Sequence, residues 1–229
     1  MTLEICANSY ISALNAQMSG AHRIELCQEL SVGGLTPSFG MLKQVAEDIN
    51  IPVHVLIRPR GGNFIYDESE LKIMSQDIMM IKELGFAGIV SGVLKSDRNI
   101  NLERTKELVE LSKPLKFTFH RAFDVIEKPK MALEQLIKLD IDRVLTSGQE
   151  SNAEKGLVLL KELKNLAKGR ITILPGGGIS DKNVSKFKKA GFTEIHASAS
   201  TIIPKDESLF AMQLSYSDPK NIKAILNAI

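Results

Sequence analysis

The chain has 229 residues, of which 44% are hydrophobic and 24% are charged, and its formal net charge at pH 7 is +2. This composition is ordinary for a globular protein, and the length suits one large domain. The small net charge, without a basic stripe carrying interleaved aromatic residues, argues against a nucleic-acid partner. With no basic leader and no apolar run of ~18 residues, we expect a cytoplasmic protein with no membrane partner.

Eight short segments with strand character follow one another along the chain. They are Leu3–Asn8, His22–Gln28, Val53–Pro59, Gly88–Gly92, Lys116–Asp124, Arg143–Gly148, Ile171–Leu174 and Glu194–Ser200. Helical patterns follow them at Ser12–Ser19, Ser38–Ile49, Glu68–Leu84, Leu102–Leu111, Pro129–Leu139, Ala153–Ala167, a stretch from Ser180 or Asp181 to Ala190, and Asn221–Ala228. A looser segment, Ile202–Pro219, precedes the last helix. Strict alternation of this kind is typical of parallel βα units.

The eightfold count favours closure of the strands into a barrel over an open, doubly wound sheet, which remains the alternative. A (β/α)8 barrel has about 250 residues, close to the length of this chain. We find no linker, low-complexity tract or charge run that would divide it. The sequence therefore predicts an α/β protein with a single TIM-barrel domain spanning residues 1–229.

The fifth segment, Lys116–Asp124, alternates phenylalanine with polar residues, which is the period of a strand with two different faces. In a barrel wrapped by helices, the phenylalanines would pack against the helices. Thr118, His120 and Asp124 would then point into the lumen. A row of titratable groups inside a barrel is unusual, because structural lumens are filled by branched apolar side chains.

Polar residues also occupy the alternate, lumen-facing positions of the other strands, a set that we call the polar phase. Its members are Glu4, Cys6, Asn8, Arg23, Glu25, Cys27, His54, Arg58, Arg60, Glu194, His196 and Ser198. Buried charges of both signs must pair to be tolerated, and the chemistry of a barrel lies at the carboxyl ends of its strands. We therefore predict a functional pocket there, with Glu25, His120 and Asp124 as candidate acid–base groups. For any one of them, a satisfied core polar group is the alternative interpretation.

A glycine-rich loop, Gly176–Gly178, follows the seventh strand, where barrels often hold phosphate through backbone amides. Ser198 and His196 on the eighth strand and Ser147 after the sixth would lie beside it. Guanidinium groups suit carboxylate or phosphate, so the set of candidate anion-binding residues is completed by Arg23, Arg58 and Arg121. The alternatives are that the glycines only permit a tight turn and that exposed arginines only add solubility.

Cys6 and Cys27 are the only cysteines, and they share the polar phase of adjacent strands. Neighbouring strands lie ~4.8 Å apart, so the two sulfurs could share a soft ion such as Cu(I). The spacing matches no recognised metal motif, and a buried cysteine often behaves as a small hydrophobic residue. Whether the sulfurs meet depends on the stagger of the barrel.

Several motifs in order resemble the CutC family of copper homeostasis proteins: HRIELCQELSVGGLTPS (22–38), IRPRGGNF (57–64), TFHRAFD (118–124), RVLTSG (143–148), LPGGG (174–178) and EIHASAS (194–200). The resemblance implies a cytoplasmic TIM barrel, often a homo-oligomer such as a dimer or tetramer, linked to copper. It also implies Cu(I) ligands at Cys6 and Cys27. Asn63 departs from the family pattern, which commonly has an acidic residue there.

Two hypotheses from different classes follow. The first is a copper homeostasis protein that binds Cu(I) through Cys6 and Cys27 and uses no organic cofactor. The second is an enzyme that acts on a small phosphorylated or carboxylated metabolite, with its anion at the loop Gly176–Gly178. The sequence leaves open whether the protein has catalytic activity.

Overall fold

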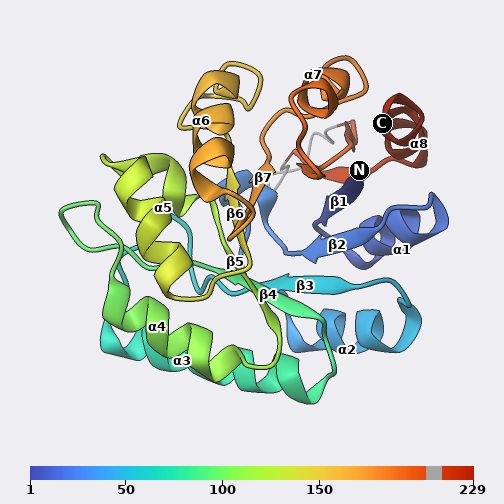
Figure 1. The fold of residues 1–229 in the computed structure, drawn as a ribbon. Helices are drawn as coiled ribbons and strands as arrows, with labels where there is room; N and C mark the ends of the chain where they lie inside the picture. The colour runs from blue at the N-terminus through green and yellow to red at the C-terminus, as the bar shows by residue number, and fades with distance from the viewer. Residues whose placement is uncertain (205–212) are drawn as a thin grey trace.

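Eight parallel strands form the centre of the molecule, and the helices lie outside them (Figure 1). The computed structural model describes residues 1–204 and 213–229. The strands are β1 (Thr2–Ala7), β2 (Arg23–Leu26), β3 (Val53–Leu56), β4 (Gly88–Ser91), β5 (Lys116–Phe119), β6 (Arg143–Thr146), β7 (Thr172–Pro175) and β8 (Glu194–Ala197). They are ordered β7-β6-β5-β4-β3-β2-β1-β8, which confirms the predicted (β/α)8 barrel.

The barrel is nearly closed. β1 pairs with β8 over four residue pairs, from Thr2 with Glu194 to Ile5 with Ala197. Between β7 and β8 the pairing is reduced to one bridge, from Gly176 to His196. Because all the strands are parallel, their carboxyl ends meet at one rim, where the predicted pocket residues lie.

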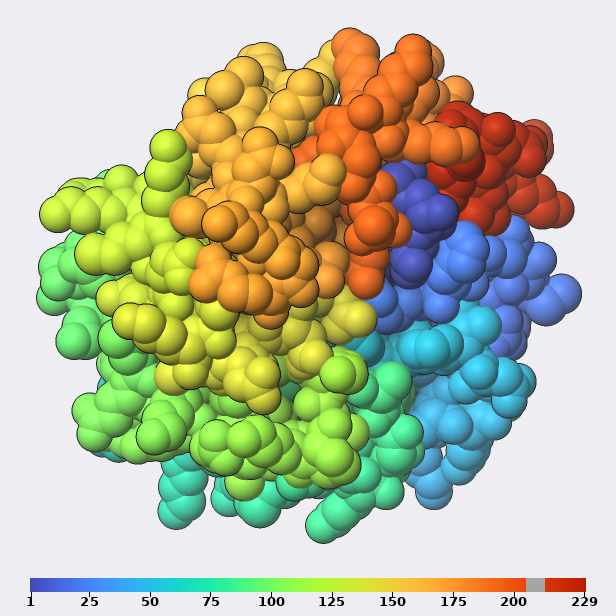
Figure 2. Space-filling view, viewed as in Figure 1, coloured from blue at the N-terminus to red at the C-terminus, as the bar shows by residue number. Residues whose placement is uncertain are grey.

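The helices cover the outer face of the barrel, and the molecule has a rounded outline in the space-filling view (Figure 2). They are α1 (Tyr10–Met18), α2 (Phe39–Asp48), α3 (Glu68–Glu83), α4 (Leu102–Ser112), α5 (Pro129–Lys138), α6 (Leu157–Ala167), α7 (Val184–Lys189) and α8 (Pro219–Ala228). Their apolar stripes and the outer strand residues form the main core, in which Phe117, Phe119 and Phe123 are buried as predicted. No helix in the described part of the chain is long and apolar enough to cross a membrane.

The predicted fifth strand is too long. β5 ends at Phe119, and Arg121–Val125 forms a 3₁₀ helix, η2. The change of conformation has a local cause, since the His120 side chain accepts a hydrogen bond from the Ala122 N–H and turns the chain away from the sheet. Asp124 therefore does not occupy the lumen-facing position on a strand that the alternation predicted for it.

The last part of the chain also differs from the prediction. β8 ends at Ala197, and Ala199 has a φ of +46°, so Ser200 lies on a separate strand. That strand, β9 (Ser200–Ile202), pairs antiparallel with β10 (Ser215–Ser217). β10 lies within the segment predicted to be loose, and β9 overlaps that segment at Ile202. Residues 205–212 of that segment lie outside the described residues. α6 begins at Leu157 rather than at Ala153, after a stretch of turns.

Candidate functional site

The lower part of the lumen holds an ion cluster. Arg23 donates through Nε to Glu4 at 2.5 Å and through Nη2 to Glu194. Arg143 donates to the same Glu194 oxygen at 3.0 Å. Two carboxylates thus meet two guanidinium groups, which is the pairing that buried charges require. Arg23 lies in this cluster and does not line the cavity described below, although the sequence placed it among the candidate anion-binding residues.

His196 connects the ion cluster to the next layer of the lumen. Its Nδ1 lies 2.8 Å from Glu4 Oε1, which leaves Nε2 as the ring nitrogen without that contact. Burial disfavours the Glu4 carboxylate, but the hydrogen bond from His196 and the charge of Arg23 outweigh burial and lower the Glu4 pKa. Burial also opposes a charged imidazole, yet Glu25, Cys6 and Glu4 together raise the pKa of His196 well above its usual value.

Cys6, Cys27, Glu25 and His196 form the layer nearer the carboxyl ends of the strands. Cys6 Sγ lies 3.7 Å from Cys27 Sγ and 3.7 Å from Glu25 Oε1. One ligand atom from each of Cys6, Glu25 and His196 lies within 4.8 Å of the others, and all three residues are buried. The hydrogen bond with Cys27, together with burial, raises the pKa of the Cys6 thiol well above its usual value. Burial raises the pKa of Glu25.

Two further histidines occupy space that glycines leave open. A Cβ on Gly88 would lie 2.6 Å from the His54 ring, and a Cβ on Gly92 would lie 2.7 Å from His120 Nδ1. Burial lowers the pKa of His54 to about 4. Burial, reinforced by the charge of Arg58, lowers the pKa of His120 to about 3. Both rings are therefore neutral at physiological pH.

A cavity of about 260 Å³ opens at the carboxyl-end rim, directly above the cysteine layer. Its wall brings together residues from seven of the eight strands or the loops that follow them. They are Cys6, Glu25, Cys27, Leu30, Gly33, Gly34, Leu56, Arg58, Phe64, His120, Arg121, Leu145, Gly177, Gly178, Ile179, His196, Ala197 and Ser198. The apolar residues among them could not be predicted, because an isolated leucine or phenylalanine near a strand end carries no distinguishing pattern in the sequence.

The two arginines after β3 hold loops in place. Arg58 lines the cavity, but its Nη1 donates to the carbonyls of Val32 and Gly34, and its Nη2 donates to the carbonyl of Gly62. Arg60 instead donates to Glu70 of α3 and to the loop carbonyls around Asn63. Both guanidinium groups therefore serve mainly to hold loops of the protein in place.

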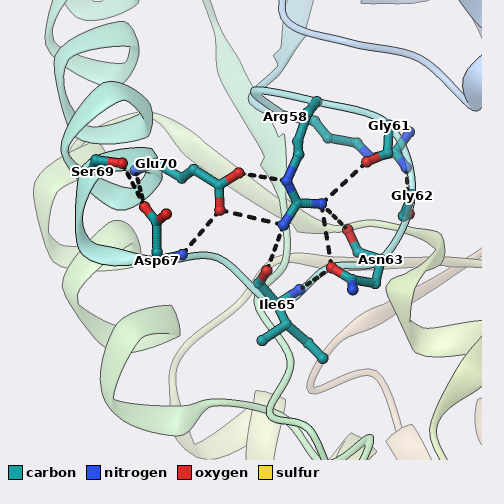
Figure 3. Close-up of polar contacts among 9 residues, drawn as sticks. Arg58, Gly61, Gly62, Asn63, Ile65, Asp67, Ser69 and Glu70 are labelled. Atoms are coloured by element: carbon teal, nitrogen blue, oxygen red, sulfur yellow. Dashed lines mark hydrogen bonds and ion pairs between the residues drawn. The ribbon is translucent and has the colours of Figure 1, made fainter.

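Asn63 lies in the same loop (Figure 3). It is not among the residues that line the cavity. Its Oδ1 accepts from Arg60 Nη1 and from Ile65 N–H, both at 3.2 Å. Next to it, Asp67 and Glu70 form the capping box that begins α3 (Figure 3). Glu70 also forms an ion pair with Arg60. Asn63 thus supplies the acceptor oxygen that an acidic residue would supply at this position.

Asp124 lies behind the cavity and positions its neighbours. Its carboxylate accepts from Thr146 Oγ1 at 2.5 Å, from Ser147 N–H at 3.0 Å and from Arg121 Nε at 2.7 Å. Ser147 is fully buried, and its hydroxyl donates to Glu150 O at 2.6 Å while accepting from Arg121 Nη2 at 3.0 Å. Neither Asp124 nor Ser147 lines the cavity, so these two candidates do not join Glu25 and His120 there.

The glycine loop after β7 has two roles, close packing and lining of the cavity. A Cβ on Gly176 would lie 2.5 Å from Leu145 Cδ1, so this glycine permits close packing and lies outside the cavity wall. Gly177 and Gly178 line the cavity with positive φ angles of +103° and +73°. Ser198 lines it from the position just after β8, with its hydroxyl 3.2 Å from that of Ser200.

Comparisons with known proteins agree with this architecture. The model of the CutC family matches residues 1–201. A CutC family protein of Photorhabdus laumondii is 50% identical over 201 residues, covering 88% of this chain and 81% of that protein. A copper homeostasis protein cutC homolog of Mus musculus is 50% identical over 198 residues, covering 86% and 73%. A solved structure described as a copper homeostasis protein CutC, from Streptococcus agalactiae, superposes with a TM-score of 0.81 at 34% identity, covering 86% of this chain and 98% of that one. The chain belongs to the CutC family.

Proposed function

We propose that the protein is a copper homeostasis protein that binds Cu(I) through Cys6 and Cys27. The observation that carries this proposal is the 3.7 Å separation of the two sulfurs. Two thiolates bound tetrahedrally to one ion at a metal–sulfur distance of about 2.3 Å lie roughly 3.8 Å apart. The two side chains therefore need almost no rearrangement to hold a single ion.

The surroundings of the two sulfurs suit a soft ion. Both cysteines are buried, at 5% and 0% exposure, and Leu56 and Val90 pack against them. Thiolate ligands in an apolar environment select Cu(I) over hard cations, which prefer oxygen ligands. The proposed site opens to the outside through the cavity, which supplies a path for a copper ion.

His196 completes the proposed ligand set. Its contact with Glu4 at 2.8 Å has the form of the carboxylate–histidine pairs that orient metal-bound imidazoles. The other ring nitrogen, Nε2, is then the one available to the ion. Glu25 would remain outside the set, as a hydrogen-bond acceptor for Cys6.

The test is competition for Cu(I) with a chromogenic chelator, under reducing conditions. We expect one tight equivalent per chain, and a loss of at least about 100-fold in affinity for Cys6→Ser and for Cys27→Ser. His196→Gln should weaken binding by about 10-fold, because one of three ligands is lost. Met18→Leu is the matched control, since it removes an exposed sulfur that does not line the cavity and should change nothing.

Binding that survives both cysteine substitutions, in variants with a wild-type circular dichroism spectrum, would overturn the proposal. So would equal losses in the Met18→Leu control. Cytoplasmic location and homo-oligomer formation, which the family resemblance implies, belong to the same proposal. Cell fractionation and light scattering test them separately from copper binding.

A further inference from the structure

The cavity wall contains three buried polar atoms that have no hydrogen-bond partner in residues 1–204 and 213–229. They are Arg58 Nε, Glu25 Oε2 and His120 Nε2, and the last two, on side chains that are each 5% exposed, belong to groups that do not otherwise hold loops in place. His120 Nδ1 accepts from Ala122 N–H at 3.3 Å, so in the neutral ring the proton is on Nε2. A buried donor or acceptor without a partner costs roughly 1–3 kcal/mol, so this arrangement points to a polar ligand.

Arg121 supplies a fixed cation at the mouth of the same cavity. Its Nε donates to Asp124 at 2.7 Å and its Nη2 donates to Ser147 at 3.0 Å. Nη1 donates to no acceptor within the described residues. Since two of the three nitrogens are already anchored, the guanidinium group is oriented before a ligand arrives, which lowers the entropic cost of binding.

The glycine loop lies directly under this guanidinium group. A Cβ on Gly177 would lie 3.6 Å from Arg121 Nη1, and φ at this residue is +103°, which favours glycine. The N–H groups of Gly178 and Ile179 donate to no acceptor in the part of the chain that is described. The hydroxyl of Ser198 lies on the same wall. The wall therefore offers guanidinium, amide and hydroxyl donors to a ligand.

The charge of the wall agrees with an anionic ligand. Apart from the histidines, the wall carries two guanidinium groups, of Arg58 and Arg121, against one carboxylate, of Glu25. We propose that this cavity binds a small phosphate monoester, with its phosphate held by Arg121, the Gly178 and Ile179 amides and Ser198, and its polar carbon end against His120 and Glu25.

Two features select this chemical class. Several donors approaching from different sides suit the three terminal oxygens of a phosphate better than the two of a carboxylate. At the inner end, a donor on His120 and an acceptor on Glu25 match a hydroxyl group, which both donates and accepts. A volume of about 260 Å³ fits the ester of a small polyol or hydroxycarbonyl compound.

The test is calorimetric titration of the metal-free protein with glycerol 3-phosphate and, in parallel, with inorganic phosphate. We expect the ester to bind more tightly than phosphate. Arg121→Gln should weaken both ligands by at least about 10-fold. Arg170→Gln is the matched control, because Arg170 is also partly exposed, at 43% against 47% for Arg121, and is also paired with a carboxylate, outside the cavity. It should leave both affinities unchanged.

Two further variants separate the ends of the ligand. His120→Phe, which keeps a ring beside Phe64, should weaken the ester by about 5-fold and leave inorganic phosphate unchanged. Ser198→Ala should weaken the binding of both ligands by about 3-fold. This variant tests the phosphate end of the site if Arg121→Gln does not fold. No heat of binding at 10 mM ligand, or equal losses in Arg121→Gln and Arg170→Gln, would overturn the proposal. The assay needs no copper, so its result is independent of the proposed Cu(I) site.

Discussion

The lower and upper layers of the lumen are built from similar residues but organised differently. In the lower layer each carboxylate meets a cation, as Glu4 meets Arg23 and Glu194 meets Arg23 and Arg143. Within the described residues, Glu25 of the upper layer has no ion pair, and its Oε2 has no hydrogen-bond partner. Charges that pair with one another build the barrel, whereas polar atoms that face a cavity unpaired are available to a ligand.

The largest expected difference between the two layers is in the stability lost when one carboxylate is removed from each. Glu4→Gln leaves Arg23 without one of its two anionic partners and removes the negative charge beside His196, so we expect a loss of about 3–5 kcal/mol in the free energy of unfolding. Glu25→Gln removes a carboxylate whose pKa burial already raises, and should cost less than about 1 kcal/mol. Urea unfolding at pH 7 measures both. Similar losses in the two variants would contradict the assignment of separate roles.

A second prediction concerns the two neutral histidines, His54 and His120, of which His120 lines the cavity. Burial lowers the pKa of His54 to about 4 and of His120 to about 3, so the unfolded state binds protons first as the pH falls below about 6.5. Each ring therefore favours unfolding as the pH falls. Glu25, whose pKa is raised, acts in the opposite sense over part of this range, so the total slope is not diagnostic.

Substitution isolates the contribution of each ring. His120→Phe and His54→Leu should each make the loss of stability between pH 6.5 and pH 5 smaller by about 1.5 kcal/mol. The measurement is a series of urea unfolding curves at fixed ionic strength. His196 serves as the contrast, because its raised pKa gives stability that is complete below pH 6.5 and is lost as the pH rises above it. An unchanged pH dependence in His120→Phe would mean that this ring is protonated in the folded protein.

The repeating period of the strands made the barrel and its polar lumen predictable from the sequence. Inward and outward residues alternate strictly, so Glu4, Glu25, His120 and His196 could be assigned to the lumen without any three-dimensional information. The contact between the cysteines could not be assigned in this way. It depends on the register that places Cys6 opposite Glu25, and register is set by packing around the whole barrel.

The hydrogen-bond partners of individual polar groups could not be predicted from the sequence either. Arg58 is held by the carbonyls of Val32, Gly34 and Gly62, and Ser147 donates to the carbonyl of Glu150, all of them in loops whose course no periodicity describes. Asp124 was misplaced because one side-chain hydrogen bond, from Ala122 to His120, outweighed the alternation of the whole segment. Local hydrogen bonds of this kind decide which polar residues remain available to a ligand.

Substitutions of Asn63 are expected to have the smallest effects on stability and ligand affinity. They test whether the upper layer extends to the loop after β3. The residue lies outside the cavity wall, and its oxygen already accepts from Arg60 and Ile65. Asn63→Asp keeps that acceptor and should change the free energy of unfolding by less than about 0.5 kcal/mol, whereas Asn63→Ala should cost about 1 kcal/mol. Neither should alter Cu(I) affinity or phosphate binding by more than about twofold, as chelator competition and calorimetry can measure. A large gain of either affinity in Asn63→Asp would extend the site to the loop after β3, because an added carboxylate can act on a ligand only if the ligand reaches it.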